Sequence, residues 1–227
     1  MAANREASVS DAGWRERAVE RSLRTARARA VSRSDRFIAA ATELLYETGR
    51  TDSTVQEIVE RSQLSLRSFY QHFGSKDELL LALFEEAVRD YVGRLRTEVD
   101  RFTDPVERLR TFVKGLYGSV DGVADPEIRA LTVYHLQLAE SHPREFATAI
   151  APQTTLLAEI VEAGVASGQF RADLGSRPLT VILMQTLVSA VHMHVLGVNL
   201  TGDPVTADGL WTFCLGGVSA PTPPADP

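Results

Sequence analysis

Apolar residues recur at every third or fourth position along most of this chain, the spacing of helices that bury one face. The first such stretch is expected to begin at a Ser34 cap and to end at Gly49. Its apolar positions are Phe37, Ala40, Ala41, Leu44 and Leu45. A second helix is expected to begin at Ser53 or Thr54, because the order Ser-Thr-Val-Gln over residues 53–56 has the form of a capping box.

A longer helix is predicted after the second capping-box pattern, Ser-Lys-Asp-Glu over residues 75–78. Its apolar stripe is long enough to connect two domains. The stripe consists of Leu79, Leu80, Leu83, Phe84, Val88, Tyr91, Val92 and Leu95.

Beyond residue 100, an aspartate precedes a proline at Asp104, Asp125 and Asp203. Aspartate is a favoured cap and proline a favoured first helical residue, so each pair indicates a helix start. The predicted helices cover residues 105–120, 126–140, 145–167, 177–198 and 204–215. Since no stretch shows sustained strand alternation, the pattern predicts an all-α fold.

Two short predicted helices, joined by a tight turn at Gln63-Leu64, carry the most informative chemistry. The second spans about residues 65–73 and ends at Gly74. We expect its inner face to consist of Leu64, Leu66, Phe69 and Phe73. We expect its exposed face to consist of hydrogen-bond donors, namely Arg67, Ser68, Tyr70, Gln71 and His72. This is the form of a helix-turn-helix that enters the major groove of DNA.

The same residues, continuing through Lys76 and Leu79, closely resemble the recognition-helix signature of the TetR family of bacterial repressors. That signature contains a Tyr-x-His-Phe core followed by a small residue, Lys, an acidic residue and a spaced Leu. The resemblance covers about residues 34–82. It implies a three-helix N-terminal helix-turn-helix DNA-binding module joined to a C-terminal helical ligand-binding and dimerisation domain.

The resemblance also implies which residues contact DNA. Phosphate contacts are expected from Thr54, Tyr70, His72 and Lys76. Arg67, Ser68 and Gln71 are the candidates for base reading, since a guanidinium can bind a guanine edge bidentately. Ser65 completes the predicted set.

Three positions depart from the family pattern. Val59 and Ser62 stand where a small residue such as Ala is usual, and Gln63 stands where Gly is usual. A left-handed Gln63 would cost about 1 kcal/mol relative to glycine.

The charge distribution is uneven although the net charge is −6. Residues 1–80 carry 13 Lys and Arg against 12 Asp and Glu, whereas the remainder carries 11 against 18. Residues 1–30 lack apolar periodicity and are predicted to form a flexible basic arm, whose later part from about Gly13 could be helical. Such an arm either is merely solvated, neutralises phosphates, or enters the minor groove.

For the C-terminal body, the resemblance implies a ligand pocket and a dimer formed by the last two long helices. Aromatic and aliphatic side chains in the apolar stripes favour a mainly apolar effector. The candidate lining is Phe84, Tyr91, Phe112, Leu116, Tyr117, Tyr134, His135, Leu138, Leu156, Ile160 and Met184. The candidate dimer interface is Leu183, Leu187, Val188, Val191, His194, Val195 and Trp211.

The segment from Pro178 to Gly202 contains no charged residue, a length compatible with a membrane span. Its many polar residues favour a buried core or interface helix instead. No metal site is expected, because His192 and His194 diverge on a helix and no metal-ligand motif occurs. The single cysteine, Cys214, permits no intrachain disulfide, which is compatible with the cytoplasm.

The sequence therefore predicts a cytoplasmic homodimeric repressor that binds a palindromic operator and is released by a small effector, with no cofactor. The predicted divisions are the arm at 1–30, the DNA-binding domain at 31–80, the body at 81–217 and a disordered tail at 218–227. A DNA-binding module without small-molecule sensing is the main alternative. An all-helical enzyme is disfavoured, since no phosphate loop, nucleophile elbow or paired catalytic carboxylates appear.

Overall fold

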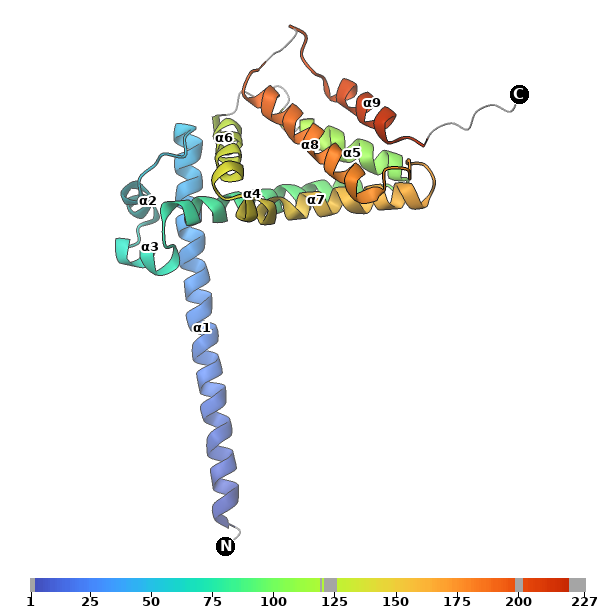
Figure 1. The fold of residues 1–227 in the computed structure, drawn as a ribbon. Coiled ribbons are helices and arrows are strands. Elements are labelled where there is room, and N and C mark those ends of the chain that lie inside the picture. Colours follow the sequence, from blue (N-terminus) through green and yellow to red (C-terminus); the bar gives the residue numbers. More distant parts are fainter. Residues whose placement is uncertain (1–2, 119, 121–125, 199–201, 221–227) are drawn as a thin grey trace, which may run out of the picture. The chain divides into compact units, whose positions relative to one another are not determined.

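The computed structural model describes residues 3–118, 120, 126–198 and 202–220, and these residues are almost entirely helical (Figure 1). The described helices are α1 (Ala3–Thr48), α2 (Val55–Ser62), α3 (Leu66–His72), α4 (Lys76–Val99), α5 (Pro105–Gly118), α6 (Pro126–Ser141), α7 (Pro143–Ala166), α8 (Ser176–Val195) and α9 (Ala207–Val218). Within the described ranges, the only β-type pairing is an isolated bridge between Phe170 and Ser219. The all-α prediction is confirmed.

The chain forms two compact units, each of which is described by itself. The first consists of residues 1–44 and 52–80, and the second of residues 45–51 and 81–227. The division falls inside α4, after Leu80.

The first unit is built around the aromatic ring of Phe37. This side chain is fully buried, and its ring centroid lies 5.4 Å from that of Phe69 and 6.2 Å from that of Phe73. Both pairs are edge-to-face, the arrangement that aromatic quadrupoles favour. Ile58 and Val59 of α2 are also buried, and the apolar positions predicted for the first helix, Phe37, Ala40, Ala41, Leu44 and Leu45, are buried as well.

The prediction that the first helix starts at a Ser34 cap is wrong. The helix α1 continues back to Ala3, so residues 3–30 are helical where a flexible arm was expected. The Ser34 hydroxyl lies in mid-helix and donates to the Ala30 carbonyl at 3.3 Å. The physical reason is the composition of the segment, since Ala, Arg and Glu are strong helix formers even without an apolar stripe.

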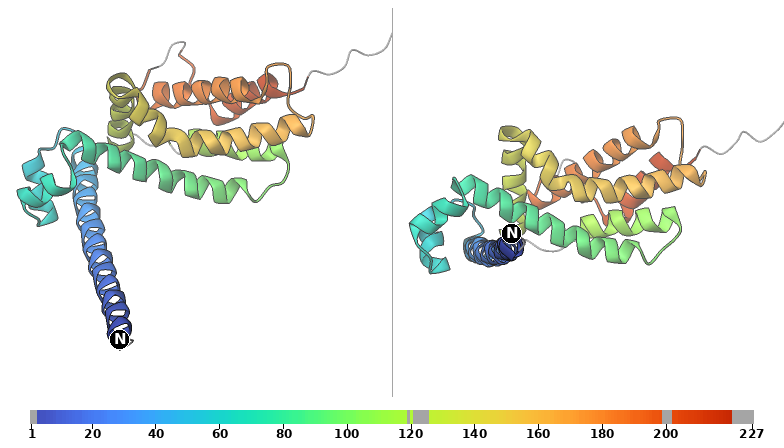
Figure 2. Two further views of the ribbon diagram at one scale, coloured as in Figure 1. Left: turned by 60° about the horizontal axis from the view of Figure 1, so that its bottom comes forward. Right: turned by 90° about the horizontal axis from the view of Figure 1, so that it is seen from below.

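The second unit buries its core mainly among α5, α7, α8 and α9, which pack on one another (Figure 2). The fully buried side chains include Leu109 and Phe112 of α5, Leu156 and Ile160 of α7, and Leu187 of α8. In Figure 2, α5, α7 and α8 lie side by side. At the end of α7, a Cβ on Gly164 would meet the Phe170 ring at 2.0 Å, so this approach requires glycine.

Two predicted boundaries in this unit are corrected. The helix α9 starts after a Thr206 cap, whose hydroxyl accepts from the Gly209 N–H at 3.0 Å, and not after Asp203. The Tyr117 hydroxyl donates to the Val205 carbonyl at 2.7 Å and so holds the preceding segment outside the helix. The predicted tail begins too early, because Val218 is fully buried and the Ala220 N–H donates to the Gln169 carbonyl at 3.0 Å. Residues 221–227 of the predicted tail lie outside the described residues.

The apolar helix α8 is long and apolar enough by length and composition alone to be a membrane-span candidate. Six of its side chains, however, are buried inside the second unit: Leu179, Thr180, Leu183, Met184, Leu187 and His192. The helix therefore has the character of a core helix that leaves one face exposed.

Candidate nucleic-acid interface and ligand cavity

A complete capping box fixes the start of α2. The Thr54 hydroxyl accepts from the Glu57 N–H at 3.2 Å, and the Thr54 N–H donates to the Glu57 carboxylate at 2.6 Å. The sequence placed this box one residue earlier, at Ser53 and Gln56. Hydrogen bonds from the Thr54 backbone and then its hydroxyl hold the pKa of Glu57 below its usual value.

The turn between α2 and α3 passes through a left-handed residue. Gln63 has φ 55° and ψ 33°, and it is the one non-glycine residue of the described chain with positive φ. Its N–H donates to the Glu60 carbonyl at 3.2 Å, and the Leu64 N–H donates to the Val59 carbonyl at 3.4 Å. The Arg36 guanidinium donates to the Ser62 carbonyl at 2.5 Å and thus places a cation at the C-terminus of α2.

The third helix, α3, presents a polar outer face on an aromatic inner face. Ser65 is its cap, with the hydroxyl accepting from the Ser68 N–H at 3.1 Å. Arg67, Tyr70 and Gln71 are exposed, as predicted.

Two residues of α3 face opposite to the prediction. Ser68 is only 9% exposed and lies with Phe69 on the buried side, whereas Leu66 is 45% exposed. At 100° per residue, the arc that contains Leu66, Arg67, Tyr70 and Gln71 faces outward, and Ser68 falls on the opposite side. Ser68 is therefore unsuited to the base-reading role given to it.

One nitrogen of the His72 ring forms a hydrogen bond within α3. Its Nδ1 atom lies 2.8 Å from the Ser68 carbonyl oxygen, which can only accept, so Nδ1 carries the hydrogen. The Nε2 atom is the one left to meet a partner outside the helix.

Lys76 opens α4, directly after a cap formed by Ser75. The Ser75 hydroxyl accepts from the Glu78 N–H at 3.2 Å, and the Glu78 carboxylate accepts from the Gly74 N–H at 2.6 Å. The second predicted capping box is thus present with its return bond shifted by one residue. Because Lys76 lies at the N-terminus of α4, the backbone N–H groups there favour an anion near its side chain.

In the second unit, α4, α5, α6 and α7 line a cavity of about 200 Å³ that is open to the surface. It is lined by Phe84, Ala87, Val88, Tyr91, Leu116, Leu131, Thr132, His135 and Gln153. Four of these were predicted from the sequence: Phe84, Tyr91, Leu116 and His135.

The other predicted lining residues lie elsewhere. Phe112, Leu156 and Ile160 are fully buried in the core, and Tyr134, Leu138 and Met184 are nearly so. Tyr117 lines a different cavity. Apolar spacing alone does not separate these core residues from the lining of the cavity, because both follow the same helical period.

Gln153 was missed, although the sequence carried a signal for it. It lies in the buried stripe of α7 with Ala149, Leu156, Leu157 and Ile160, so a polar amide interrupts an otherwise apolar face. It also follows Pro152, which leaves one backbone hydrogen bond of α7 unmade.

Two histidines meet beside this cavity. The ring centroids of His135 and His192 are 4.6 Å apart, and the His135 ring also lies 4.6 Å from Phe146 and 5.5 Å from Phe84. Burial lowers the pKa of His135 to about 4, with a further contribution from His192. Burial also lowers the pKa of His192. Both rings are therefore neutral near pH 7.

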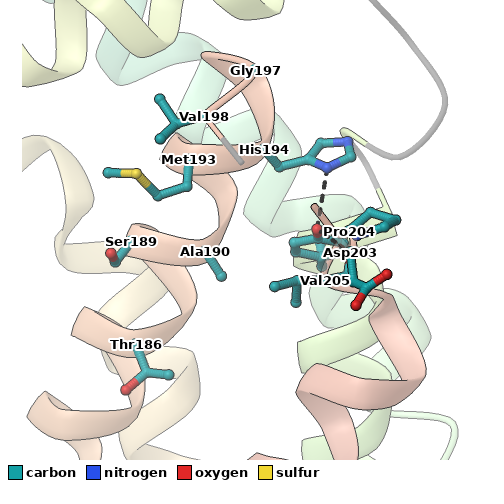
Figure 3. A pocket seen from close by; sticks show the side chains of 11 residues that line it. Thr186, Ser189, Ala190, Met193, His194, Gly197, Val198, Asp203, Pro204 and Val205 are labelled. Carbon is teal, nitrogen blue, oxygen red and sulfur yellow. Dashed lines mark hydrogen bonds between the residues drawn. The ribbon is translucent and has the colours of Figure 1, made fainter. Parts of the chain in front are cut away.

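A larger cavity of about 630 Å³ lies beside the C-terminal half of α8 (Figure 3). Thr186, Ser189, Ala190 and Met193 project from α8 on one side, with Pro204 and Val205 across from them (Figure 3). The Tyr117 hydroxyl lies 3.1 Å from Nδ1 of His194, whose Nε2 lies 3.1 Å from the Val120 carbonyl.

The predicted dimer residues separate into two groups. Leu183 and Leu187 are buried in the core of the second unit, so they are unavailable to a partner. Val188, Val191, His194, Val195 and Trp211 are half-buried. The exposed apolar side chains of α8 and α9 are Val181, Ile182, Met193 and Phe213, and Phe213 is 68% exposed. Burial of the other face of α8 explains the correction, because the uncharged sequence did not reveal which side was inward.

Among the described residues, no three His, Cys, Asp or Glu side chains gather in a group that could hold a metal ion. Cys214 is a buried free thiol, and burial raises its pKa to about 11.

Comparisons with known proteins agree with this architecture. Residues 37–83 match the family model of bacterial regulatory proteins of the tetR family. The transcriptional repressor KstR2 of Mycolicibacterium smegmatis is 25% identical over 83% of this chain and 91% of its own length. The transcriptional regulator HbdR of Aromatoleum sp. is 31% identical over 43% of each chain.

Solved structures share the fold. The fatty acid degradation regulator FadR from Bacillus halodurans superposes with a TM-score of 0.65 at 23% identity, over 81% of this chain and 98% of that one. FadR from Bacillus subtilis, solved in complex with stearoyl-CoA, gives a TM-score of 0.65 at 19% identity, over 80% and 97%. The solved structures show the shared fold, and the match of residues 37–83 to the family model together with the similarity to curated regulators shows that the chain belongs to the TetR family of bacterial transcriptional regulators.

Proposed function

We propose that this protein is a homodimeric, cytoplasmic repressor that binds a palindromic operator and is released by a small, mainly apolar effector. The observation that carries the DNA-binding half is the two-faced α3. Its Phe69 and Phe73 anchor the helix on Phe37, which leaves Arg67, Tyr70 and Gln71 free to face a groove. A helix held in this way can present the same donors at every binding event.

A two-fold dimer follows from how little a seven-residue recognition helix can read alone. Two copies double the readable sequence and match a palindrome whose half-site centres lie about 34–36 Å apart, or a multiple of that. The exposed apolar side chains Val181, Ile182, Met193 and Phe213 give α8 and α9 a face that a second copy would cover.

The effector site is proposed to be the cavity among α4, α5, α6 and α7. Its lining is mostly apolar, with Tyr91, Thr132, His135 and Gln153 as the residues that carry polar groups. Acyl thioesters are the first class to test, because FadR proteins of Bacillus subtilis and Thermus thermophilus were solved with stearoyl-CoA and lauroyl-CoA. The continuous helix α4 connects residues of both units and is the proposed transmitter. A coupling of about 1–3 kcal/mol would change operator affinity about 5–150-fold.

Two other functions compete with this one. A DNA-binding protein without an effector is favoured if no compound that stabilises the second unit changes operator affinity. An enzyme is disfavoured by the kind of protein to which the chain is similar, since its named relatives are transcriptional regulators.

The test is to select bound fragments from the source genome and to footprint the shared site. Protection of two half-sites by a dimer supports the proposal, and protection of a non-palindromic site by a monomer contradicts it. Release of the same fragment by hydrophobic metabolites then tests the sensing half separately.

A further inference from the structure

Gln153 brings a side-chain amide to the cavity of the second unit. The residue is only 9% exposed and lines the cavity, and its amide atoms are not among the buried atoms of the described chain that lack a hydrogen-bond partner. The amide carries two donors and two acceptor lone pairs, and it lies in a stripe of α7 whose other buried side chains are apolar. A molecule in the cavity can therefore form hydrogen bonds with this amide.

The partner must suit a lining without charge. None of the nine lining residues is Asp, Glu, Lys or Arg. The one titratable nitrogen group among them is His135, whose ring is packed against Phe84, Phe146 and His192 and whose pKa is lowered to about 4. An ionised carboxylate placed here would lose its water and gain no counter-ion.

We infer that this cavity selects effectors whose buried polar group is uncharged, and that Gln153 is the specificity-determining residue. The ligand class is a neutral acyl derivative, such as an amide, ester or thioester, in preference to the free acid of the same chain. The Gln153 amide donates to the acyl carbonyl while the apolar chain lies against Phe84, Val88 and Leu131. This inference rests on the effector site of the proposed function.

Octanamide and octanoate provide an isosteric pair that differs in charge. Binding of each to the full-length protein is measured by calorimetry at pH 7.5, and release of the operator is measured in parallel. Octanamide should bind about tenfold or more tightly than octanoate. Gln153→Leu should weaken octanamide about two- to tenfold, the effect of one hydrogen bond. Gln153→Lys should reverse the preference, because it adds the missing cation.

Gln137→Leu is the matched control, since Gln137 is exposed on α6 and lies outside the cavity lining, and it should leave both affinities unchanged. Thermal unfolding of each variant identifies any loss of folding, and the reversal in Gln153→Lys is a gain that misfolding does not produce. Equal or tighter binding of octanoate by the wild type, or a preference unchanged in both Gln153 variants, would overturn the inference. Release of DNA by whichever compound binds would still uphold the proposed function, whereas binding without release would contradict that function and leave the charge preference standing.

Discussion

The Glu57 carboxylate accepts hydrogen bonds from Thr54, the residue from which the family resemblance leads us to expect a phosphate contact. One oxygen of this carboxylate accepts from both the Thr54 N–H, at 2.6 Å, and the Thr54 hydroxyl, at 2.8 Å. A phosphate that approached Thr54 would therefore meet a negative charge at the start of α2. The capping box that orders the helix thus competes with the contact expected at the same place.

Glu57→Gln should increase operator affinity about two- to fivefold at low salt, with a smaller gain at high salt, because one repulsive charge is removed and exposed charges are screened. Fluorescence anisotropy against a labelled operator over a salt series measures this. Glu60→Gln removes an equal charge one turn further along α2 and should have less effect. Equal gains in the two variants would show that the position of Glu57 is unimportant.

The capping box also makes a pH prediction for the first unit. Because the folded state lowers the pKa of Glu57, the box contributes stability above the ordinary glutamate pKa, and this contribution is lost as pH falls through the lowered value. In Glu57→Gln this acid-dependent part should be absent. Hydrogen exchange of the α2 amides between pH 6 and 3 measures the difference.

Arg67 and Lys76 should affect DNA binding in different ways. Arg67→Ala should relax base preference in each half-site at a cost of about 1–3 kcal/mol. Lys76→Ala should weaken all sequences about equally and reduce the salt slope by roughly one unit per site. Competition binding against a library of operator variants separates these outcomes, and identical specificity profiles would refute the assigned roles.

Gln63→Gly should stabilise the helix-turn-helix by about 0.5–1 kcal/mol. Glycine relieves the left-handed strain at φ 55°, although it also gains freedom in the unfolded chain. Gln71→Gly changes the same residue type within regular helix and should destabilise by about 1 kcal/mol. Hydrogen exchange of the α2 and α3 amides in urea reports this unit alone, and a loss of protection in Gln63→Gly would contradict the argument.

The histidine pair should make the second unit sensitive to acid. The folded pKa of His135 is depressed to about 4, so its neutral state supports folding above the unfolded histidine pKa of about 6.5. That stability is lost as pH falls from about 6.5 to about 4, amounting to about 1–2 kcal/mol by pH 5. His135→Phe should flatten this dependence in thermal unfolding, whereas His142→Gln, at an exposed position, should not.

Exposed Phe213 and buried Leu187 should respond differently to truncation. Phe213→Ser should shift the dimer toward monomer in sedimentation while the monomer stays folded, because this side chain is 68% exposed in one copy. Leu187→Ala should lower the free energy of unfolding by about 2–5 kcal/mol, since it leaves a cavity in the core. A stable dimer of Phe213→Ser would move the interface away from this face.

The main features of the N-terminal module could be predicted from the sequence. The apolar spacing of Phe37, Phe69 and Phe73 predicted three side chains that do meet in one core. Gln63, which stands where glycine is usual in the family, is the one non-glycine residue with positive φ in the part of the chain that the structure describes. These features depend on contacts within a few residues or on a strict helical period, and both can be read from the sequence alone.

Other predictions failed where long-range packing made the decision. An apolar period in α8 did not reveal that Leu183 and Leu187 face inward while Ile182 faces outward, because both faces are apolar. Likewise, Phe112 and Leu116 share one stripe, yet only Leu116 reaches the cavity.

The sequence by itself determined the all-α class, the helix-turn-helix and its outer donors Arg67, Tyr70 and Gln71, since helical period and capping are local properties. Only the tertiary structure decided that Ser68 is buried, that Phe213 is exposed, and that Gln153 and His135 share one uncharged cavity. The shared cavity depends on which surfaces of α4, α5, α6 and α7 meet, and the burial of Ser68 and the exposure of Phe213 depend in the same way on the packing of α3 and α9. Segments far apart in the sequence determine this packing together, because the fold that buries the greatest apolar area with the fewest voids is the most stable.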